Sequence, residues 1–364
     1  MVLLYLFAFV VLINCCYFLL FSKFSFLTDP HEIKKENFPV SLIICAKNET
    51  KNLKENIPLW LNQKYSDYEI ILINDASYDD TLEVMESFER EDSRIKIVNV
   101  ENIETFWGSK KYALTLGIKK AKHQRMVFSD ADCKPASPYW LQEMAANFTV
   151  NKQVILGYGA YNKTPGLLNK LIRFETFMTA LQYFSYAKAG FPYMGVGRNL
   201  GYTSKIYYDN SGFVSHMKVQ SGDDDLFVNE VATKSNTAIC YSQESFTYSK
   251  PKRTWKKWIK QKKRHISTAK YYKLKHRILL GSYFVFQLFF WVLSLLTFIF
   301  LDWKIPLALI IFRLLIQFIV LHKAMKKLDE KDLIYWFPFL EIVLITFQFS
   351  IFISNSTSKT GSWK

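Results

Sequence analysis

An uncharged apolar run near the carboxyl-terminal end of the chain most constrains how it can fold. Residues 278–301 contain no charged residue and are rich in Phe and Leu. A run of this length and composition predicts a helix that crosses a lipid bilayer. Residues 2–22 form a second uncharged run at the other end of the chain. We therefore expect membrane helices at both ends, with an amino-terminal anchor over residues 1–22.

Two weaker candidates follow at 305–321 and 333–353, and each contains one ionisable residue, Arg313 and Glu341. An ionisable group at membrane depth needs a partner or a polar cavity. If HKAMKKLDEKD between the two segments is the loop of a helical hairpin, the two residues lie at similar depth, and we predict that they pair. The alternative is that the third segment lies on the membrane rather than across it. Residues 278–354 would then hold three transmembrane helices in the first case and fewer in the second.

Basic residues predict the orientation of these segments. They follow the first segment, precede the second and lie between the third and fourth: Lys23, Lys34, Lys35, residues 250–277, Lys323, Lys326 and Lys327. With four crossings all these loops lie on one side, which positive charge marks as cytoplasmic. The first segment lacks the basic start and small-residue cleavage site of a signal peptide, which favours an uncleaved anchor. We expect an integral protein of the cytoplasmic membrane.

The net charge of +15 is concentrated in one part of the chain. Residues 250–277 hold thirteen Lys and Arg and no acidic residue, and Trp255, Trp258, Ile259 and Ile266 fall near helical spacing. A basic amphipathic helix with Trp residues is typical of a helix on an anionic membrane surface. No zinc-finger spacing or RNA-recognition signature occurs, so nucleic acid is not an expected partner.

Residues 40–132 alternate between strand-like and helix-like segments. Apolar runs predict strands at 40–46, 68–75, 95–100 and 125–132, and intervening segments predict helices at 50–63, 79–91 and 109–121. Strands that alternate with helices predict an α/β fold with a mostly parallel sheet and right-handed crossovers. No glycine-rich dinucleotide or P-loop motif occurs in this region, which argues against both of those nucleotide sites.

Three polar clusters stand directly after predicted strands. They are Lys47-Asn48-Glu49, Asn74-Asp75-Ala76-Ser77 and Asp130-Ala131-Asp132. Open α/β sheets bind ligands at the carboxyl ends of their strands. Asp130 and Asp132 offer two hard oxygen donors, which suit Mg²⁺ or Mn²⁺ bound to a diphosphate. A solvated acidic loop is the alternative for this pair.

The other two clusters and the third predicted helix offer further groups to a nucleotide. Glu49 and Asp75 can accept hydrogen bonds from a base or a ribose hydroxyl, although one acid after one strand is also an ordinary helix cap. Lys110 or Lys111, at the start of the third helix, can assist with the phosphates. The equal alternative is that these lysines belong to a solvated helix face.

The segments VSLIICAKNE, ILINDASYDDT, GSKKYAL and FSDADC occur in this order and spacing. In them the chain resembles the family 2 glycosyltransferases, which invert anomeric configuration and have a GT-A-type fold with a Rossmann-like sheet. The resemblance is strong over residues 38–140 and looser to 275, and it places a catalytic domain at 38–249. It implies a UDP- or GDP-sugar donor and a divalent metal. It also implies that Glu49 and Asp75 hold the nucleoside, that Asp130 contacts ribose or metal and that Asp132 ligates the metal. The complete set of expected donor-binding residues is Ala46, Glu49, Asp75, Lys110, Asp130 and Arg264.

Residues 193–209 resemble the acceptor-side segment of this family. Gly195, Gly197 and Gly201 surround Arg198-Asn199, and glycines permit a ligand to approach the backbone closely. The resemblance implies that Gly197 and Asn199 lie on the acceptor side. A loop without a substrate is the alternative.

Three consecutive carboxylates, Asp223, Asp224 and Asp225, follow in SGDDDLFVNE. Like charges in contact raise the pKa of at least one member. An inverting transfer needs one carboxylate to accept the proton of the acceptor hydroxyl. The pair that the family uses can be the first two or the last two aspartates here. We favour Asp224 as the base with Asp223 next, although a helix cap also explains an acid at this position.

Gln261-Lys262-Lys263-Arg264-His265 stands where the family has a Q-x-x-R-W motif. Gln261 and Arg264 match, and His265 replaces the tryptophan that borders the acceptor sugar in processive synthases. We therefore expect Gln261 and His265 on the acceptor side. This departure argues against processive chain extrusion. Arg264 suits a diphosphate, or it is one more cation that faces lipid headgroups.

These patterns together predict a membrane-bound, metal-dependent glycosyltransferase. The expected partners are a nucleotide-sugar donor and a lipid or lipid-linked acceptor. A polyprenyl phosphate acceptor is the alternative within this class, and it needs no base because its oxygen is already ionised. A nucleotidyltransferase with a similar sheet, or a membrane scaffold without chemistry, is the alternative from another class.

Overall fold

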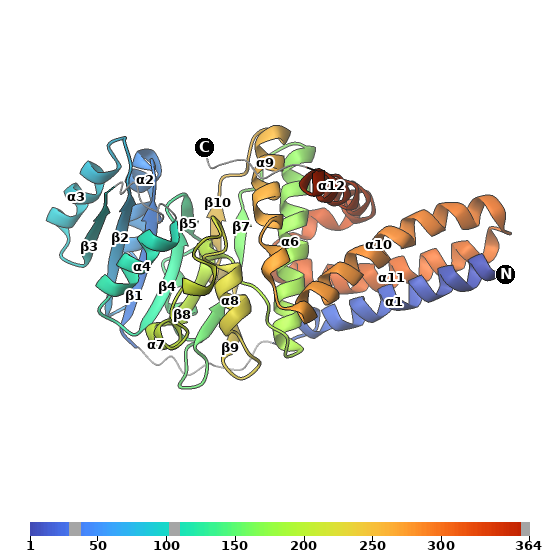
Figure 1. The fold of residues 1–364 in the computed structure, drawn as a ribbon, viewed down its shortest axis with the longest axis horizontal. Coiled ribbons are helices and arrows are strands. Elements are labelled where there is room, and N and C mark those ends of the chain that lie inside the picture. Colours follow the sequence, from blue (N-terminus) through green and yellow to red (C-terminus); the bar gives the residue numbers. More distant parts are fainter. Residues whose placement is uncertain (29–37, 102–109, 358–364) are drawn as a thin grey trace.

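A seven-stranded sheet occupies one half of the molecule and long apolar helices occupy the other (Figure 1). The computed structural model describes residues 1–28, 38–101 and 110–357. Expectations for residues 29–37, 102–109 and 358–364, including Lys34 and Lys35, lie outside the described residues.

The central sheet is parallel over its first four strands. Its strands run in the order β3 (Ile95–Val100), β2 (Tyr68–Asp75), β1 (Val40–Ala46), β4 (Arg125–Asp130), β8 (Leu200–Thr203), β6 (Val154–Leu156) and β9 (Thr237–Ile239). β8 is antiparallel to both β4 and β6. The predicted mostly parallel α/β sheet is confirmed, and the fourth strand ends at Asp130 rather than at residue 132.

Helices cover both faces of the parallel strands, which is why these strands read as continuous apolar runs. α2 (Thr50–Leu61), α3 (Thr81–Glu91) and α4 (Lys110–Lys120) follow the first three strands. Leu42 and Ile44 of β1 belong to the core on one face, and Ile43 packs in the core on the other. Side chains that point alternately to the two faces are therefore buried on both.

The second half of the α/β part adds a small sheet and further helices. The small sheet has the order β5 (Cys133–Pro135), β10 (Thr247–Ser249) and β7 (Gly159–Tyr161). The helices are α5 (Trp140–Ala145), α6 (Leu167–Lys188), α7 (Ser204–Asp209), α8 (Asp225–Val231) and α9 (Trp255–Ile266). α6 and α9 stand between the sheets and the apolar helices (Figure 1).

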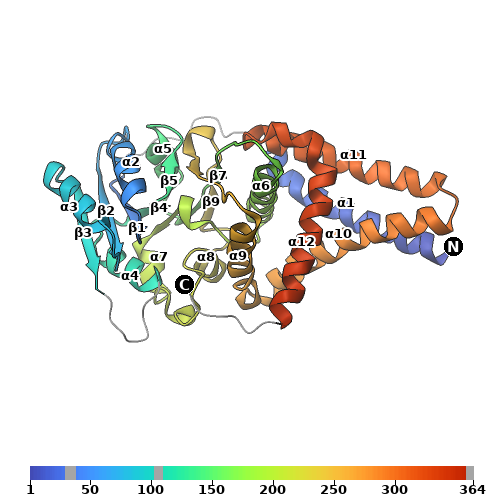
Figure 2. The same cartoon turned by 90° about the horizontal axis from the view of Figure 1, so that it is seen from above.

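Four helices in the described parts of the chain are long and apolar enough to cross a membrane. α1 (Val2–Ser25), α10 (Leu274–Phe300) and α11 (Lys304–Lys327) lie side by side as a bundle. The amino terminus and the α10–α11 connection lie at the end of this bundle far from the sheet (Figures 1 and 2). α12 (Phe337–Thr357) runs across the bundle and packs against α6 and α9 (Figure 2).

The predicted pairing of Arg313 with Glu341 is confirmed. Arg313 Nη2 lies 2.9 Å from Glu341 Oε1, and both side chains are buried. Gln317 donates a hydrogen bond to Glu341 Oε1 at 2.9 Å, and Arg313 Nη2 donates one to Gln287 Oε1 at 3.0 Å. The buried charges are thus hydrogen-bonded as well as paired, as such groups must be at this depth.

The helical hairpin from which this pairing was derived is wrong. A short 3₁₀ segment, Lys331–Trp336, separates α11 from α12, and the chain changes direction there. The third apolar segment, α11, runs along α1 in the bundle, so the fourth segment rather than the third departs from it. Two ion pairs hold this turn: Arg173 of α6 lies 2.8 Å from Glu330 through Nε and 2.9 Å from Asp332 through Nη1.

Candidate active site

The three polar clusters that follow strands meet at one edge of the sheet. The β1–β2 register places Ala46 opposite Asn74, and the β1–β4 register places Cys45 opposite Asp130. The Asn48 N–H donates to Ser77 Oγ at 2.9 Å, which ties the loop after β1 to the loop after β2. The predicted edge is therefore assembled from all three clusters.

Asp130 and Asp132 form the centre of this edge. One ligand atom each from Asp130, Asp132 and Cys133 lies within 4.8 Å of the others. Burial raises the pKa of Asp130, but the ammonium of Lys110, 2.8 Å away, outweighs it and lowers the pKa below its usual value. Burial and the neighbouring charge of Asp130 raise the pKa of Asp132. The charge of Asp130 is thus balanced by Lys110, whereas Asp132 is repelled by the negative charge of Asp130.

This pair of carboxylates fits a divalent cation. Burial raises the pKa of the Cys133 thiol well above its usual value, so the thiol stays protonated at neutral pH. The Cys133 thiol lies 3.0 Å from Ser249 Oγ and donates to Asp132 Oδ1 at 3.4 Å. The ligands that remain are hard carboxylate oxygens, which suit Mg²⁺ or Mn²⁺ better than a softer metal.

Lys110 links this pair to the second acidic group. Its Nζ lies 2.8 Å from Asp130 Oδ1 and 3.1 Å from Asp223 Oδ2. Lys111 has a different role, because its buried Nζ donates to the carbonyls of His216 and Val219 at 2.7 and 2.9 Å. The first lysine of α4 faces the site and the second holds a loop, so neither belongs to a solvated helix face.

The three consecutive aspartates have different surroundings. Asp224 Oδ2 accepts a hydrogen bond from the Gly197 N–H at 2.7 Å, and Oδ1 accepts one from the Asp225 N–H at 2.7 Å. Burial, with the charges of Asp223 and Asp225, raises the pKa of Asp224 to about 7. A carboxylate with this pKa can hold a proton transiently at neutral pH.

Asp225 is engaged by other parts of the fold. Its Oδ2 accepts hydrogen bonds from Thr268 Oγ1 at 2.5 Å and from the Tyr272 hydroxyl at 2.7 Å. These partners belong to the segment after α9, so Asp225 fixes that segment to the start of α8. Its burial leaves Asp223 and Asp224 as the two aspartates closer to the open part of the site.

The glycine-rich segment contributes Gly197 but not Asn199. A Cβ added at Gly197 would lie 3.4 Å from Asp224 Cβ and Oδ2, so the glycine leaves the approach to this carboxylate open. Asn199 is fully buried, accepts a hydrogen bond from Trp140 Nε1 at 3.1 Å and donates to the Ser245 carbonyl at 2.7 Å. The structure therefore places Asn199 in the core, away from the acceptor side where we expected it.

Arg198, which the sequence did not single out, faces the site instead. Its Nε and Nη2 donate to the Gly159 carbonyl at 3.1 and 2.6 Å. A Cβ at Gly159 would lie 2.1 Å from Arg198 Nε, so this arginine requires a glycine there. In the sequence, the only indication that Arg198 belongs to the site was its position next to Asn199, which we expected on the acceptor side.

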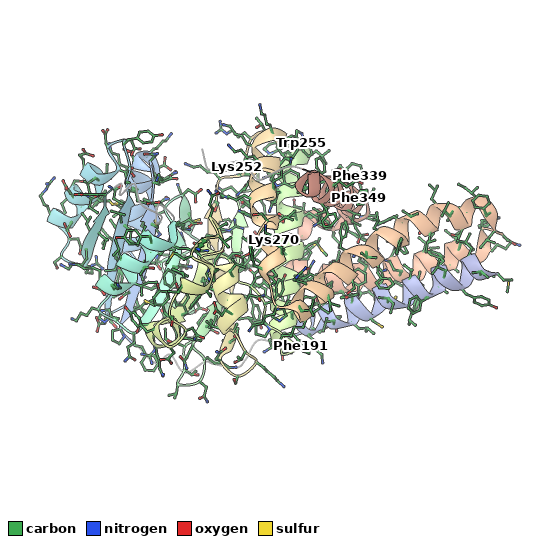
Figure 3. The ribbon with its side chains drawn as sticks, in the orientation of Figure 1. Phe191, Lys252, Trp255, Lys270, Phe339 and Phe349 are labelled. Carbon is green, nitrogen blue, oxygen red and sulfur yellow. The ribbon has the colours of Figure 1, made fainter. Side chains whose placement is uncertain are left out.

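α9 lies against the site with one side and against α12 with another. Gln261, Arg264 and His265 line the same cavity as the aspartates, and Gln261 Nε2 lies 3.4 Å from the Tyr161 hydroxyl. Trp258 is buried, and its ring centroid is 5.4 Å from that of Phe347 in α12. Figure 3 shows Lys252 and Trp255 at the start of this helix and Lys270 beyond its end. Residues 250–277 thus contribute side chains to the site as well as an exposed basic surface.

One cavity of about 950 Å³ joins these groups. Its lining includes the acidic residues on the sheet side, α6 and α9 in the middle, and α10 and α12 on the far side. The site residues among its lining are Lys110, Asp130, Asp132, Gly197, Arg198, Asp223, Asp224, Gln261, Arg264 and His265. Ala46, Glu49 and Asp75 lie at the same sheet edge but are outside the described lining of this cavity. Burial raises the pKa of Glu49, with Asp132 and Asp130 adding to the effect.

Two family models match this chain. The model "Glycosyl transferase family 2" matches residues 41–208, and "Glycosyl transferase family group 2" matches residues 129–349, more than half of the chain. The chain belongs to the family 2 glycosyltransferases. The predicted family is therefore confirmed.

Curated relatives match only part of this glycosyltransferase-family chain. An "Uncharacterized glycosyltransferase" of Haemophilus influenzae is 35% identical over 127 residues, 35% of this chain and 38% of the relative. A Methanococcus voltae relative is 26% identical over 169 residues, 42% of this chain and 49% of its own length. Its name is "Dolichyl N-acetyl-alpha-D-glucosaminyl phosphate 3-beta-D-2,3-diacetamido-2,3-dideoxy-beta-D-glucuronosyltransferase". The chain thus spans less than half the length of these relatives.

A solved structure resembles nearly the whole fold. The mannosyltransferase from Pyrobaculum calidifontis, in complex with GDP-Man and Mn²⁺, has a TM-score of 0.60 at 12% identity. The similarity covers 94% of this chain and 97% of the mannosyltransferase. This likeness confirms the GT-A-type fold that the sequence predicts.

Proposed function

We propose that this protein transfers a sugar, with inversion, from a nucleoside-diphosphate sugar to a hydroxyl group of a lipid or lipid-linked acceptor. The observation that carries the proposal is that two acidic groups of different character line one cavity. Asp130 and Asp132 have the donor set for a divalent cation, and Asp224 has the raised pKa of a proton acceptor. Lys110 connects the two groups, because its Nζ lies 2.8 Å from Asp130 Oδ1 and 3.1 Å from Oδ2 of Asp223, the residue before Asp224.

Residues at the sheet edge would bind the donor. Ala46 and Asp75 are the last residues of β1 and β2, and Glu49 follows β1, at the edge where a nucleoside fits an open α/β sheet. Asp132, with Asp130, would hold Mg²⁺ or Mn²⁺, and such an ion neutralises the charge of the departing nucleoside diphosphate. The mannosyltransferase of similar fold contains GDP-Man and Mn²⁺, which supports this donor class and metal.

The other residues bind and orient the reactants. Lys110, Arg198 and Arg264 present cations to the cavity where the diphosphate would lie. The N–H groups of Gly197 and Asp225 each donate to one oxygen of Asp224 and fix this carboxyl group at the wall of the cavity. Asp224 takes the proton of the acceptor hydroxyl as its oxygen attacks the anomeric carbon from the face opposite the leaving group. A single displacement of this kind inverts the anomeric configuration.

The membrane location is part of the same proposal. Lys23 lies in the last turn of α1, Arg277 in the first turn of α10 and Lys327 at the end of α11, and these helix ends lie at the end of the bundle near the sheet. Positive residues favour the cytoplasmic side of a membrane. We infer that α1, α10 and α11 cross the cytoplasmic membrane and that the α/β part faces the cytoplasm, with α12 along the boundary.

The test is a screen of purified full-length protein with UDP-, GDP- and dTDP-sugars in the presence of Mn²⁺ or Mg²⁺. The proposal expects metal-dependent release of a nucleoside diphosphate from one donor. A parallel arm supplies nucleoside triphosphates and sugar 1-phosphates, and release of pyrophosphate in that arm would instead identify a nucleotidyltransferase. No turnover of any donor, with correctly folded protein, would contradict the glycosyltransferase proposal for these residues.

A further inference from the structure

The cavity that contains the aspartates continues beyond the α/β part of the molecule. Its far lining comes from two apolar helices, Leu280 and Phe284 of α10 and Leu344, Phe347 and Ile351 of α12. These helices have the length and composition of membrane spans. A site for chemistry on a sugar alone would not require such a wall.

The middle part of the cavity, between the aspartates and the apolar helices, combines polar side chains with a set of aromatic and aliphatic ones. α6 contributes Phe174, Met178 and Tyr183, and α9 contributes Trp258. The Tyr183 hydroxyl donates to the Gly157 carbonyl at 2.7 Å, so its polar end is already satisfied. Aromatic and aliphatic side chains therefore form a path from the catalytic groups to α10 and α12.

The charged side chains along this path have partners or are exposed to solvent. Lys262 of α9 forms an ion pair with Glu175 of α6, and Glu341 of α12 is paired with Arg313. Lys270 and Arg277 border the cavity but are exposed. A buried polar group without a partner is costly, and here the ion pairs leave a wall suited to a hydrocarbon chain.

We propose that the part of the cavity between α6, α9, α10 and α12 is an alkyl-chain site, and that the acceptor is a neutral lipid with a free hydroxyl group. This inference rests on the proposed glycosyl transfer. The lipid would enter sideways from the bilayer between α10 and α12, with its hydroxyl group at Asp224. Asp223 and Asp224, the two aspartates closer to the open part of the site, disfavour an anionic headgroup such as a phosphate at that place.

The reaction of such a lipid balances with the groups present. The hydroxyl oxygen forms a bond to the anomeric carbon of the donor sugar, and the bond from that carbon to the diphosphate oxygen breaks. The hydroxyl proton goes to Asp224, and the electron pair of the broken bond leaves with the nucleoside diphosphate. The product is a neutral glycolipid, which can return to the bilayer by the same path.

Gly281 of α10 provides a direct test of the alkyl-chain site. It lines the cavity, and a Cβ added there would meet no atom within 4 Å. Gly281→Trp should therefore place an indole ring in this part of the cavity, because the backbone position leaves room for a side chain. Ile278→Trp is the matched control, because Ile278 is on the same helix, is 61% exposed and lies outside the described lining.

The probe is dodecanol that carries a photoreactive diazirine, added to full-length protein in phosphatidylcholine vesicles. We expect cross-links on the cavity side of α10 and α12, mapped by mass spectrometry at residues such as Phe284 and Phe347. Labelling should fall roughly tenfold in Gly281→Trp and stay unchanged in Ile278→Trp, because only the first substitution occupies the site. Hydrolysis of nucleotide sugar without acceptor should be equal in all three proteins.

Several outcomes would overturn the inference. Equal labelling of Gly281→Trp and the unsubstituted protein, or labelling only of side chains outside the cavity, would exclude the alkyl-chain site. Displacement of the probe by excess dodecyl phosphate more strongly than by excess dodecanol would exclude a neutral acceptor. Cross-linking as expected without any nucleotide-sugar turnover would contradict the proposed function and support the alkyl-chain site by itself.

Discussion

Asp224→Asn separates the contribution of Asp224 to catalysis from its contribution to stability. The amide oxygen of Asn can still accept the hydrogen bond from the Gly197 N–H, whereas its NH₂ group cannot accept the one from the Asp225 N–H, a loss of about 1 kcal/mol. The substitution removes the group that would accept the proton of the acceptor hydroxyl. General base catalysis contributes roughly 10²- to 10⁴-fold to a rate. We expect kcat/KM to fall by this factor, about 3–5 kcal/mol of transition-state stabilisation.

The same substitution should not weaken the fold. Burial raises the pKa of Asp224 from 3.8 to about 7, which corresponds to at most ~4 kcal/mol of unfavourable free energy for the ionised form. A carboxyl group whose folded pKa is raised lowers stability as pH rises from its unfolded pKa to its folded pKa. The penalty is therefore largest above pH 7, and Asp224→Asn removes it. We expect an unchanged or higher Tm at pH 8 and little difference at pH 4.

The assays are steady-state release of nucleoside diphosphate between pH 5 and 9 and thermal unfolding over the same range. With Asp224 present, kcat/KM should fall about tenfold per pH unit below its pKa and level off above it. Asp209→Asn is the control, because Asp209 is exposed and pairs with Lys205 at the surface. Full activity of Asp224→Asn would refute the role of Asp224 as base and favour an acceptor that is already ionised, such as a polyprenyl phosphate.

Three further experiments test other parts of the molecule. Asp132→Asn should abolish turnover and the rise in Tm that Mn²⁺ produces, while the metal-free Tm stays equal or rises because one of two like charges is gone; a retained Mn²⁺ effect on Tm would contradict this metal site. Lys110→Met should lower stability by about 1–3 kcal/mol, measured by urea unfolding in detergent, because the carboxylates on both sides of it lose their shared cation; unchanged stability would show that this cation is dispensable for folding. Arg313→Ala and Glu341→Ala should each cost about 3–5 kcal/mol, and the double variant less than their sum, since either residue alone leaves a buried charge unpaired; simple additivity in that cycle would exclude an energetic role for the pair.

Local patterns in the sequence were sufficient to predict several elements of the fold and site. Apolar runs determined the four strands at 40–46, 68–75, 95–100 and 125–130, because parallel strands covered on both faces need such runs. The end of each run also determined where polar side chains such as Asp130 would emerge. Uncharged segments determined the helices of membrane length. These features depend on residues that are close in sequence, so the periodicity and composition of a short segment are enough to predict them.

Contacts between distant segments decided the rest. Lys110 and Lys111 are adjacent in sequence, and only the packing of α4 against the loop at His216 determines which one faces the aspartates. The same holds for Arg198 at the cavity and Asn199 in the core. The crosswise path of α12, and with it the apolar wall of the cavity, depends on ion pairs between α6 and residues after α11. Sequence by itself determined the elements and the chemical groups, and the tertiary structure decided which groups meet, because long-range packing selects one face of each element.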